Sequence, residues 1–286
     1  MKNMSLVFAL FGVIILLCVS GMKPTVNWYT NTNLDNNKRI YKVNPSVFDG
    51  FYFCCGEYEF TGNGKFTFKN SSGLVPNIDH FRSKVSSIYI HGGILSDEIF
   101  SIDFDDLKPA FKQAAELAQQ LNIDGYLVDY EPHSDSKDLA KNYTNFLHEF
   151  GTILHKYNIK IGCDIAGWGI LKYFDLYAKS ELDFYTSMTP TYNGNNLTYN
   201  EEYVHNELQY IKPDNLRTGI GSMLTTYPAN HTWYFNWTKS ELNTFLSFLK
   251  DDVKVPSVDI WRADMDNNGY DTESWFYNDL NSFVNN

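Results

Sequence analysis

The 286-residue sequence is poor in cysteine. Of its four cysteines, Cys18 lies in an N-terminal apolar run, which leaves Cys54, Cys55 and Cys163. Three is an odd number, and their spacing matches neither a metal site nor a disulfide framework. We expect small buried apolar side chains at all three positions, with a bridge between the adjacent Cys54 and Cys55 as the open alternative.

Basic residues are also scarce, with 23 Lys and Arg against 34 Asp and Glu and a net charge of −11. No basic cluster is present, so a nucleic-acid partner is not expected. Nine prolines and 18 glycines follow no period, which excludes a collagen-like chain. An apolar content of 43% excludes a disordered one.

Long apolar runs are absent except at the start of the chain. Met1–Gly21 has one Lys, an apolar stretch over Leu6–Val19 and then small residues, which is typical of a secretory signal peptide. The stretch is shorter than the roughly 20 residues of a membrane span, although an uncleaved anchor stays open. We therefore expect a secreted or lysosomal glycoprotein without a stable membrane anchor. Five glycosylation sequons support this location, at Asn70, Asn142, Asn196, Asn230 and Asn236.

The rest of the chain alternates short apolar runs with amphipathic segments. The runs predict strands covered on both faces, at Thr25–Tyr29, Val47–Cys54, Ser86–His91, Gly125–Tyr130, Lys160–Asp164, Phe184–Thr189, Leu216–Gly221 and Ser257–Trp261. Helices are predicted at Asp105–Leu121, Lys137–Tyr157, Ile170–Leu182, Glu201–Ile211, Lys239–Leu249 and Trp275–Val284. This pattern indicates an α/β fold, a single (β/α)8 TIM barrel over residues 22–286, with an open doubly wound sheet as the alternative. A barrel would place its active site at the carboxyl ends of the strands.

The most informative segment is the predicted fourth strand, Ile123–His133. Side chains alternate along a strand, so Leu127, Asp129 and Glu131 should point into the barrel. Two neighbouring carboxyls in a poorly solvated site raise the pKa of one of them, which can then donate a proton near neutral pH. A solvated rim or a contact with a helix terminus is the alternative role for this pair.

Asp124–Glu131 resembles the D-G-x-D-x-D-x-E strand of glycoside hydrolase family 18, which includes chitinases and endo-β-N-acetylglucosaminidases. Three further segments resemble that family's third, sixth and eighth strands: Tyr89–Gly93, Asp183–Met188 and Ile260–Trp261. The middle Asp of the strand motif is Leu127 here, and Ile90 stands in a Ser position.

The resemblance implies substrate-assisted retaining cleavage next to a 2-acetamido sugar. Glu131 would be the acid and then the base, and Asp129 would orient the acetamido group. The tyrosine that contacts the acetamido carbonyl would be Tyr192, followed by Asn193, with Tyr185 as its rival. Leu127 cannot share a proton with Asp129, which puts the charge cycling of Asp129 in question.

Aromatic residues near the strand ends could supply sugar-stacking surfaces. Trp261 is the main candidate, and Trp28 and Trp168 fit sugar contact and core packing equally well. Asp164 could bind a sugar hydroxyl or cap a loop. No cofactor and no metal are expected: Asp264–Gly269 begins like a calcium loop, but Trp275 replaces its final Glu.

Together these features predict a glycosidase that cleaves β-linked N-acetylglucosamine in chitin oligosaccharides or N-glycan cores. The partner would be an oligosaccharide or glycan substrate, and protein partners are not indicated. The alternatives are a catalytically silent, chitinase-like lectin and, less favoured, a barrel that inhibits or scaffolds another protein.

Overall fold

A computed structural model describes residues 24–31, 48–69, 73–132, 134–193, 196–221, 237–261 and 275–285. The predicted signal peptide and the Asp264–Gly269 loop lie outside these residues, as do the sequons at Asn70, Asn230 and Asn236. Within the described part of the chain, no helix is long and apolar enough to cross a membrane.

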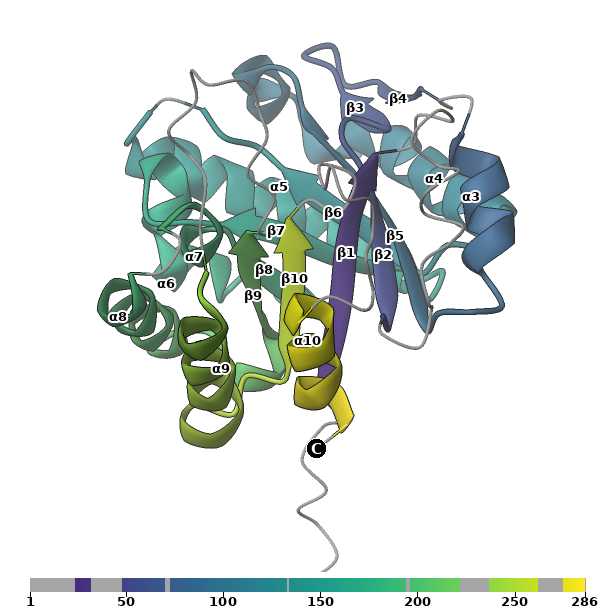
Figure 1. Cartoon of the computed structure of the whole chain (residues 1–286). Helices are drawn as coiled ribbons and strands as arrows, with labels where there is room; N and C mark the ends of the chain where they lie inside the picture. The colour runs from purple at the N-terminus through teal and green to yellow at the C-terminus, as the bar shows by residue number, and fades with distance from the viewer. Residues whose placement is uncertain are drawn as a thin grey trace, which may run out of the picture.

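Eight parallel strands of the described chain close into a ring (Figure 1). They are β1 (Thr25–Asn31), β2 (Gly50–Cys54), β5 (Ser87–Ile94), β6 (Gly125–Asp129), β7 (Lys160–Ile165), β8 (Phe184–Ser187), β9 (Leu216–Gly221) and β10 (Ser257–Trp261). Pairing follows chain order, and the β1–β10 and β2–β5 ladders close the circle. The TIM barrel is therefore confirmed and the open sheet is excluded, because each of these strands has two neighbours within the ring. A hairpin of β3 (Tyr58–Phe60) and β4 (Phe66–Phe68) extends from β5.

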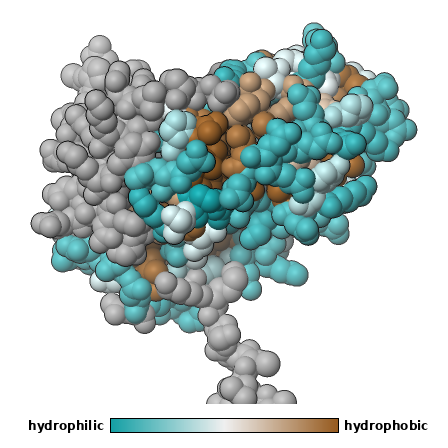
Figure 2. All heavy atoms as spheres, turned by 90° about the vertical axis from the view of Figure 1, so that its right-hand side faces the viewer, coloured by the Kyte–Doolittle hydropathy of each residue, from teal (hydrophilic) through white to brown (hydrophobic). Residues whose placement is uncertain are grey.

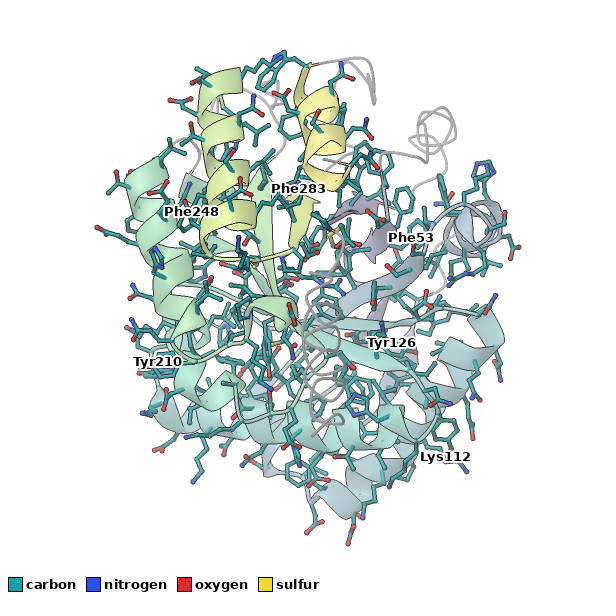
Figure 3. The ribbon with its side chains drawn as sticks, turned by 90° about the horizontal axis from the view of Figure 1, so that it is seen from below. Phe53, Lys112, Tyr126, Tyr210, Phe248 and Phe283 are labelled. Atoms are coloured by element: carbon teal, nitrogen blue, oxygen red, sulfur yellow. A yellow bond between two sulfur atoms is a disulfide. The ribbon has the colours of Figure 1, made fainter. Side chains whose placement is uncertain are left out.

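Helices surround the ring, as the view from below shows (Figure 3). Their bounds are α3 (Leu74–Phe81), α4 (Phe104–Leu121), α5 (Lys137–His155), α6 (Phe174–Tyr177), α7 (Thr189–Asn193), α8 (Leu197–Leu208), α9 (Lys239–Ser247) and α10 (Trp275–Asn285). Shorter turns are η3 (Asp97–Ser101), η4 (Gly169–Lys172), η5 (Pro213–Asn215) and η6 (Phe248–Asp252). The predicted helix over Ile170–Leu182 is in fact η4 followed by α6.

The helix α4 illustrates how local sequence sets these boundaries. The Asp103 side chain accepts a hydrogen bond from the Asp105 backbone N–H at its start. The helix ends at Leu121, and the residue after it, Asn122, has a left-handed φ of 53°. Between them, Leu107, Phe111 and the small residues of the same stripe are buried against the barrel.

Polar residues cover most of the coloured face in Figure 2, with an apolar strip between them.

Apolar side chains form one layer outside the ring and a second cluster inside it. The inner cluster consists of Tyr29, Tyr52, Cys54, Tyr89, Leu127 and Phe184, with Trp261 packed against it. Gly162 leaves room for this filling, because a Cβ there would lie 2.2 Å from the Phe184 ring. The barrel interior is thus a packed core rather than a pore.

The cysteines differ from the expectation in two respects. Cys55 is exposed rather than buried. Cys54 and Cys55 form a disulfide, so the favoured interpretation of two unbridged side chains is wrong. A bridge between adjacent cysteines closes a very small ring, and for this reason the sequence favoured unbridged side chains. Cys163 is free and buried, as predicted.

Candidate active site

The strand β6 and the residues after it place both predicted carboxyls at one pocket. Leu127 belongs to the inner cluster, whereas Tyr126 and Val128 belong to the outer layer. Asp129 and Glu131 both line the pocket, as the period-two alternation predicts. Glu131 is exposed at the mouth, and Asp129 lies deeper, with its side chain 28% exposed.

The first residue of the motif has a different position. Asp124 lies before β6, at the amino end of the strand. Its Oδ2 accepts hydrogen bonds from Arg82 Nη1 at 2.6 Å and from the Ile88 backbone N–H at 2.7 Å. This carboxylate therefore anchors β6 to β5 rather than lining the pocket.

The pocket has a volume of about 90 Å³ and opens at the carboxyl ends of the strands. Seven of the eight barrel strands or the segments that follow them supply its lining, all but β2. The lining residues are Tyr29, His91, Asp129, Glu131, Asp164, Thr186, Met188, Thr191, Gly219 and Trp261. Trp261 is half-buried and meets Tyr29 edge-on, with 5.0 Å between ring centroids.

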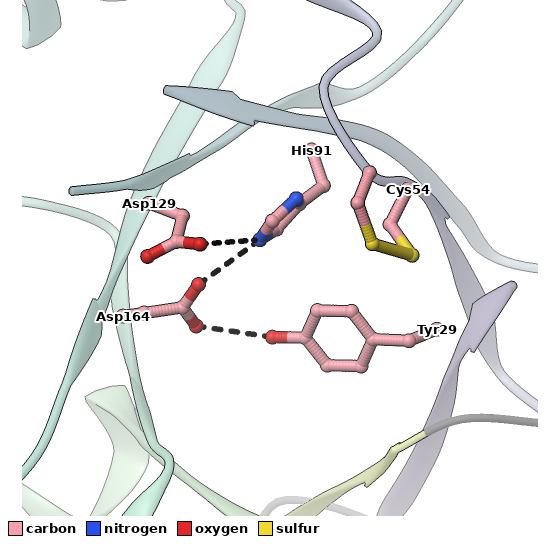
Figure 4. Close-up of a disulfide and its surroundings, with 6 residues drawn as sticks. Tyr29, Cys54, His91, Asp129 and Asp164 are labelled. Atoms are coloured by element: carbon pink, nitrogen blue, oxygen red, sulfur yellow. Dashed lines mark hydrogen bonds and ion pairs between the residues drawn. A yellow bond between two sulfur atoms is a disulfide. The ribbon is translucent and has the colours of Figure 1, made fainter. Parts of the chain in front are cut away.

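A buried polar group lies at the base of this pocket (Figure 4). The His91 Nε2 atom lies 3.1 Å from Asp164 Oδ2 and 3.8 Å from Asp129 Oδ2. The Tyr29 hydroxyl donates to Asp164 Oδ1 at 3.1 Å. Four residues from β1, β5, β6 and β7 thus form one connected group, which we call the His91 cluster. The Cys54–Cys55 disulfide lies beside it (Figure 4).

Strand register and a glycine make this close approach possible. His91 pairs with Leu127 and Gly93 pairs with Asp129 between β5 and β6. A Cβ at Gly93 would lie 2.1 Å from the Asp129 carbonyl oxygen, so this position requires glycine. Gly93 therefore lets β5 approach the acidic end of β6.

The electrostatics of the cluster favour bound protons. The pKa of Asp129 is raised to about 8, first by burial and then by the negative charge of Asp164, with His91 opposing and Glu131 adding to the rise. Burial raises the pKa of Asp164 well above its ordinary value, and the Glu131 charge adds to this, whereas the Tyr29 hydrogen bond opposes it. The two aspartates cannot both ionise easily, so at least one proton is shared within the group near neutral pH.

Among the described residues, His91, Asp129 and Asp164 are also the group whose ligand-type atoms come together, all within 4.8 Å of one another. His91 Nε2 and Asp164 Oδ2 are at hydrogen-bond distance, 3.1 Å. Asp129 Oδ2 lies 3.8 Å from the same nitrogen, so its contact with His91 is electrostatic rather than a hydrogen bond.

The acid candidate Glu131 has an aromatic neighbour. Trp168, which follows β7, donates from Nε1 to Glu131 Oε2 at 3.3 Å and is 36% exposed. The ring therefore lies beside the exposed Glu131, at the edge of the pocket.

Two predicted site residues are not in the pocket. Trp28 is fully buried in the outer layer against Phe48 and Tyr277, so it packs in the core and the sugar-contact prediction for it is wrong. The neighbouring Tyr29 points inward instead. Tyr185, the rival for the acetamido contact, is buried outside the ring and donates to the Tyr177 carbonyl at 2.8 Å.

Tyr192 and Asn193 end the helix α7, directly after β8. Their side chains lie outside what the structure describes, so the roles given to them stay predictions.

Sequence reasoning assigned no role to His91, Thr186 or Thr191. His91 was visible within the Tyr89–Gly93 motif, and alternation along β5 places it on the inner face with Tyr89. A strand-end histidine facing inward is the signal that could have identified it. Thr191 follows β8 and carries no such pattern.

No protein-family model matches the chain, and no curated protein sequence is significantly similar to it. Solved structures do match it. A chitinase from Chromobacterium violaceum has a TM-score of 0.69 at 12% identity, covering 92% of this chain and 99% of that one. The GH18 chitinase ChiB from Flavobacterium johnsoniae has a TM-score of 0.64 at 15% identity, covering 92% and 94%. The spore cortex-lytic enzyme SleL from Bacillus megaterium has a TM-score of 0.66 at 11% identity, covering 90% and 74%.

Similarity at these identities concerns the fold, and it extends over nearly the whole described barrel. The chain therefore has the barrel fold of the GH18 chitinases, the family that its fourth barrel strand resembles.

Proposed function

We propose that the protein is a glycoside hydrolase that cleaves β-linked N-acetylglucosamine, in chitin oligosaccharides or N-glycan cores. The observation that carries the proposal is the joint placement of Asp129 and Glu131 at one pocket with an aromatic residue, Trp261, on its wall. The fold of chitinases and of a spore cortex-lytic enzyme supports a glycan substrate.

The chemistry follows from the positions of the two carboxyls. Glu131, exposed at the mouth, protonates the leaving glycosidic oxygen and later removes a proton from the attacking water. The acetamido oxygen of the substrate attacks the anomeric carbon, so the nucleophile comes from the sugar rather than from the protein. Asp129, lying deeper, accepts the acetamido N–H and stabilises the cationic intermediate.

The pocket size fits these roles of Glu131 and Asp129. Pockets that enclose a whole drug-sized ligand have volumes of about 300–1,000 Å³. A volume of about 90 Å³ suits a substituent such as the acetamido group, with the sugar ring across the mouth. Trp261 and Trp168 border that mouth and offer apolar faces for the ring.

The test is to replace Glu131 with Gln and assay chitooligosaccharides and a high-mannose glycopeptide. The wild type should release products, and E131Q should lose at least about 99% of the rate, because the amide cannot donate or accept the catalytic proton. Glu98→Gln, which removes an equal charge from the exposed turn η3, should keep the wild-type rate. An active wild type with an equally active E131Q contradicts the assignment of the acid.

Leu127 favours one second candidate, a carbohydrate-binding protein without turnover. This side chain fills the motif position that carries a carboxyl in the family the strand resembles, and it is fully buried. Saturable binding of chitooligosaccharides without product, at high protein concentration and long times, would decide for the lectin.

The location proposed for the protein is secreted or lysosomal, after removal of residues 1–21. Two sequon asparagines within the described residues, Asn142 and Asn196, are exposed and open to glycosylation. Protein collected from the medium of expressing eukaryotic cells should lose mass on treatment with an N-glycosidase. Retention of an unglycosylated chain in the cytosol would contradict the location.

A further inference from the structure

The motif position of Leu127 leaves Asp129 without a carboxyl neighbour on its own strand. We propose that His91 and Asp164 together are the proton partner of Asp129, supplied from β5 and β7 in place of that neighbour. The inference rests on the proposed function, and it assigns positioning roles to two residues that act through Asp129.

Strand register brings the partner to the right level. His91 pairs with Leu127 across the β5–β6 ladder, so its imidazole occupies the inner face beside the apolar side chain. The β6–β7 ladder pairs Val128 with Cys163, which makes Asp164 the next residue level with Asp129. Two adjacent strands therefore supply what β6 lacks.

The contacts require a shared proton. His91 Nε2 lies between Asp164 Oδ2 at 3.1 Å and Asp129 Oδ2 at 3.8 Å. Two carboxylates facing a nitrogen lone pair would repel each other and the nitrogen, whereas one proton among the three atoms removes the repulsion. The Tyr29 hydroxyl holds the other oxygen of Asp164 at 3.1 Å, which fixes the orientation of its carboxyl.

The shared proton has a definite use in the proposed reaction. Asp129 must be an acceptor when the acetamido N–H arrives, so its O–H bond breaks and an N–H bond forms at His91 Nε2. The imidazolium is then held by the Asp164 carboxylate. The group carries one net negative charge before and after the transfer, and the proton returns when the product leaves.

Titratable and charged groups from several elements act on the cluster. Those inside the ring are Tyr29 from β1, Asp129 and Glu131 from β6 and its following segment, Asp259 from β10 and, beside Asp259, Arg217 from β9. Cys163 of β7, Tyr58 of β3 and Tyr143 of α5 lie in the outer layer and interact with it only through charge. The buried Asp259 is already held by Asn27, Tyr52 and Thr186. It acts on Asp164 only through its charge and does not compete for the proton.

The kinetic test is Asp164→Asn, assayed on a chitooligosaccharide across the pH range. We expect kcat to fall at least about tenfold with KM within about twofold, because binding contacts remain while the proton partner is lost. The acidic limb of the kcat profile should move down by about one pH unit, since the Asp164 charge raises the pKa of Asp129. A uniform scaling of the profile, without movement of the limb, would overturn the proposal.

The matched control is Asp183→Asn. This carboxylate also contacts a histidine, His155 at 2.9 Å, but at the amino end of β8, away from the pocket. Its removal should leave the pH profile in place.

A second variant, L127D in the D164N background, returns a carboxyl to β6. Its rate should be at least about threefold higher than that of D164N alone, whereas L127N in the same background should give no increase.

An independent readout does not need activity. The imidazole signals of the seven histidines can be followed by NMR, with His91 identified from the H91Q variant. In D164N the His91 midpoint should fall by more than about one pH unit, because the imidazolium loses its closest anion, and it should stay in place in D183N. A His91 midpoint unchanged within about 0.2 pH unit in folded D164N would overturn the proposal, whatever the activity of that variant.

The outcomes separate the two levels of the account. A wild type that cleaves no glycan, with a responsive His91, refutes the proposed function and leaves the proton-sharing group in place. A wild type that cleaves chitooligosaccharides, with a His91 midpoint that does not change in D164N, supports the proposed function and refutes the proton-sharing group. Dialysis against EDTA should not change the wild-type rate, and a loss restored by added Zn²⁺ would show that the cluster holds a cation instead of a proton.

Discussion

A buried glutamate outside the pocket makes the stability of this barrel depend on pH. Glu207 in α8 is fully buried, and its Oε1 accepts a hydrogen bond from Ser187 Oγ at 2.5 Å. Burial raises the pKa of Glu207 to about 8, and the Ser187 hydrogen bond only partly opposes the rise. The folded protein therefore binds this proton more tightly than the unfolded chain does.

The direction of the effect follows from that difference. Between the ordinary pKa of 4.5 and about 8, folding takes up a proton, so the free energy of unfolding falls as the pH rises. The contribution of Glu207 is complete below pH 4.5 and is lost as the pH passes 8. A difference of about 3.5 in pKa corresponds to about 5 kcal/mol as an upper value, and relaxation around the charged form lowers it to about 2–4 kcal/mol.

The assay is urea denaturation of the wild type and Glu207→Gln at pH 5 and pH 8. Asp129 and Asp164 titrate in the same direction, so only the difference between the two proteins isolates Glu207. The wild type should lose about 2–4 kcal/mol more than the variant between the two pH values. Glu202→Gln, an exposed position on the same helix, is the control. Parallel pH dependence of wild type and E207Q would refute the reasoning.

Three further substitutions test other parts of the structure. Trp168→Phe keeps an aromatic ring but removes the donor to Glu131 at 3.3 Å, so kcat on chitooligosaccharides should fall about three- to tenfold, measured by product release. Arg217→Met removes the cation that lies 3.5 Å above the Phe184 ring and beside the buried Asp259, and urea denaturation should show a loss of about 2–4 kcal/mol. Thr238→Ala removes the capping box of α9 and should cost about 1 kcal/mol in the same assay, with no change in activity. An unchanged rate or unfolding free energy would contradict the corresponding contact.

The ring of strands could be predicted from sequence because each strand is a short apolar run with its own local signal. Leu216–Gly221 and Ser257–Trp261 agree with β9 and β10 at both ends. The helix α3 and the β3–β4 hairpin were missed, because they are short and their stability comes from packing on β5 and the outer layer rather than from local pattern.

The carboxyl pair of the candidate site could be predicted from one strand and the residues directly after it, and Trp261 from its place at the end of a strand. Asp129 and Glu131 share a face by alternation, which sequence shows directly. Asp164 and His91 are 73 residues apart, and their contact depends on the register of three strands, which sequence does not show. The correction at Trp28 has the same origin, since a shift of one residue decides whether a side chain faces the pocket or the outer layer.

The most direct test of the account is the dependence of cleavage on the acetamido group. Initial rates on a chitooligosaccharide should be compared with those on its fully deacetylated counterpart, while NMR follows the anomer that is released first. The account predicts cleavage of the acetylated substrate alone, with the β-anomer formed first, because the acetamido oxygen is the nucleophile. Equal cleavage of the deacetylated substrate, or first release of the α-anomer, would contradict it.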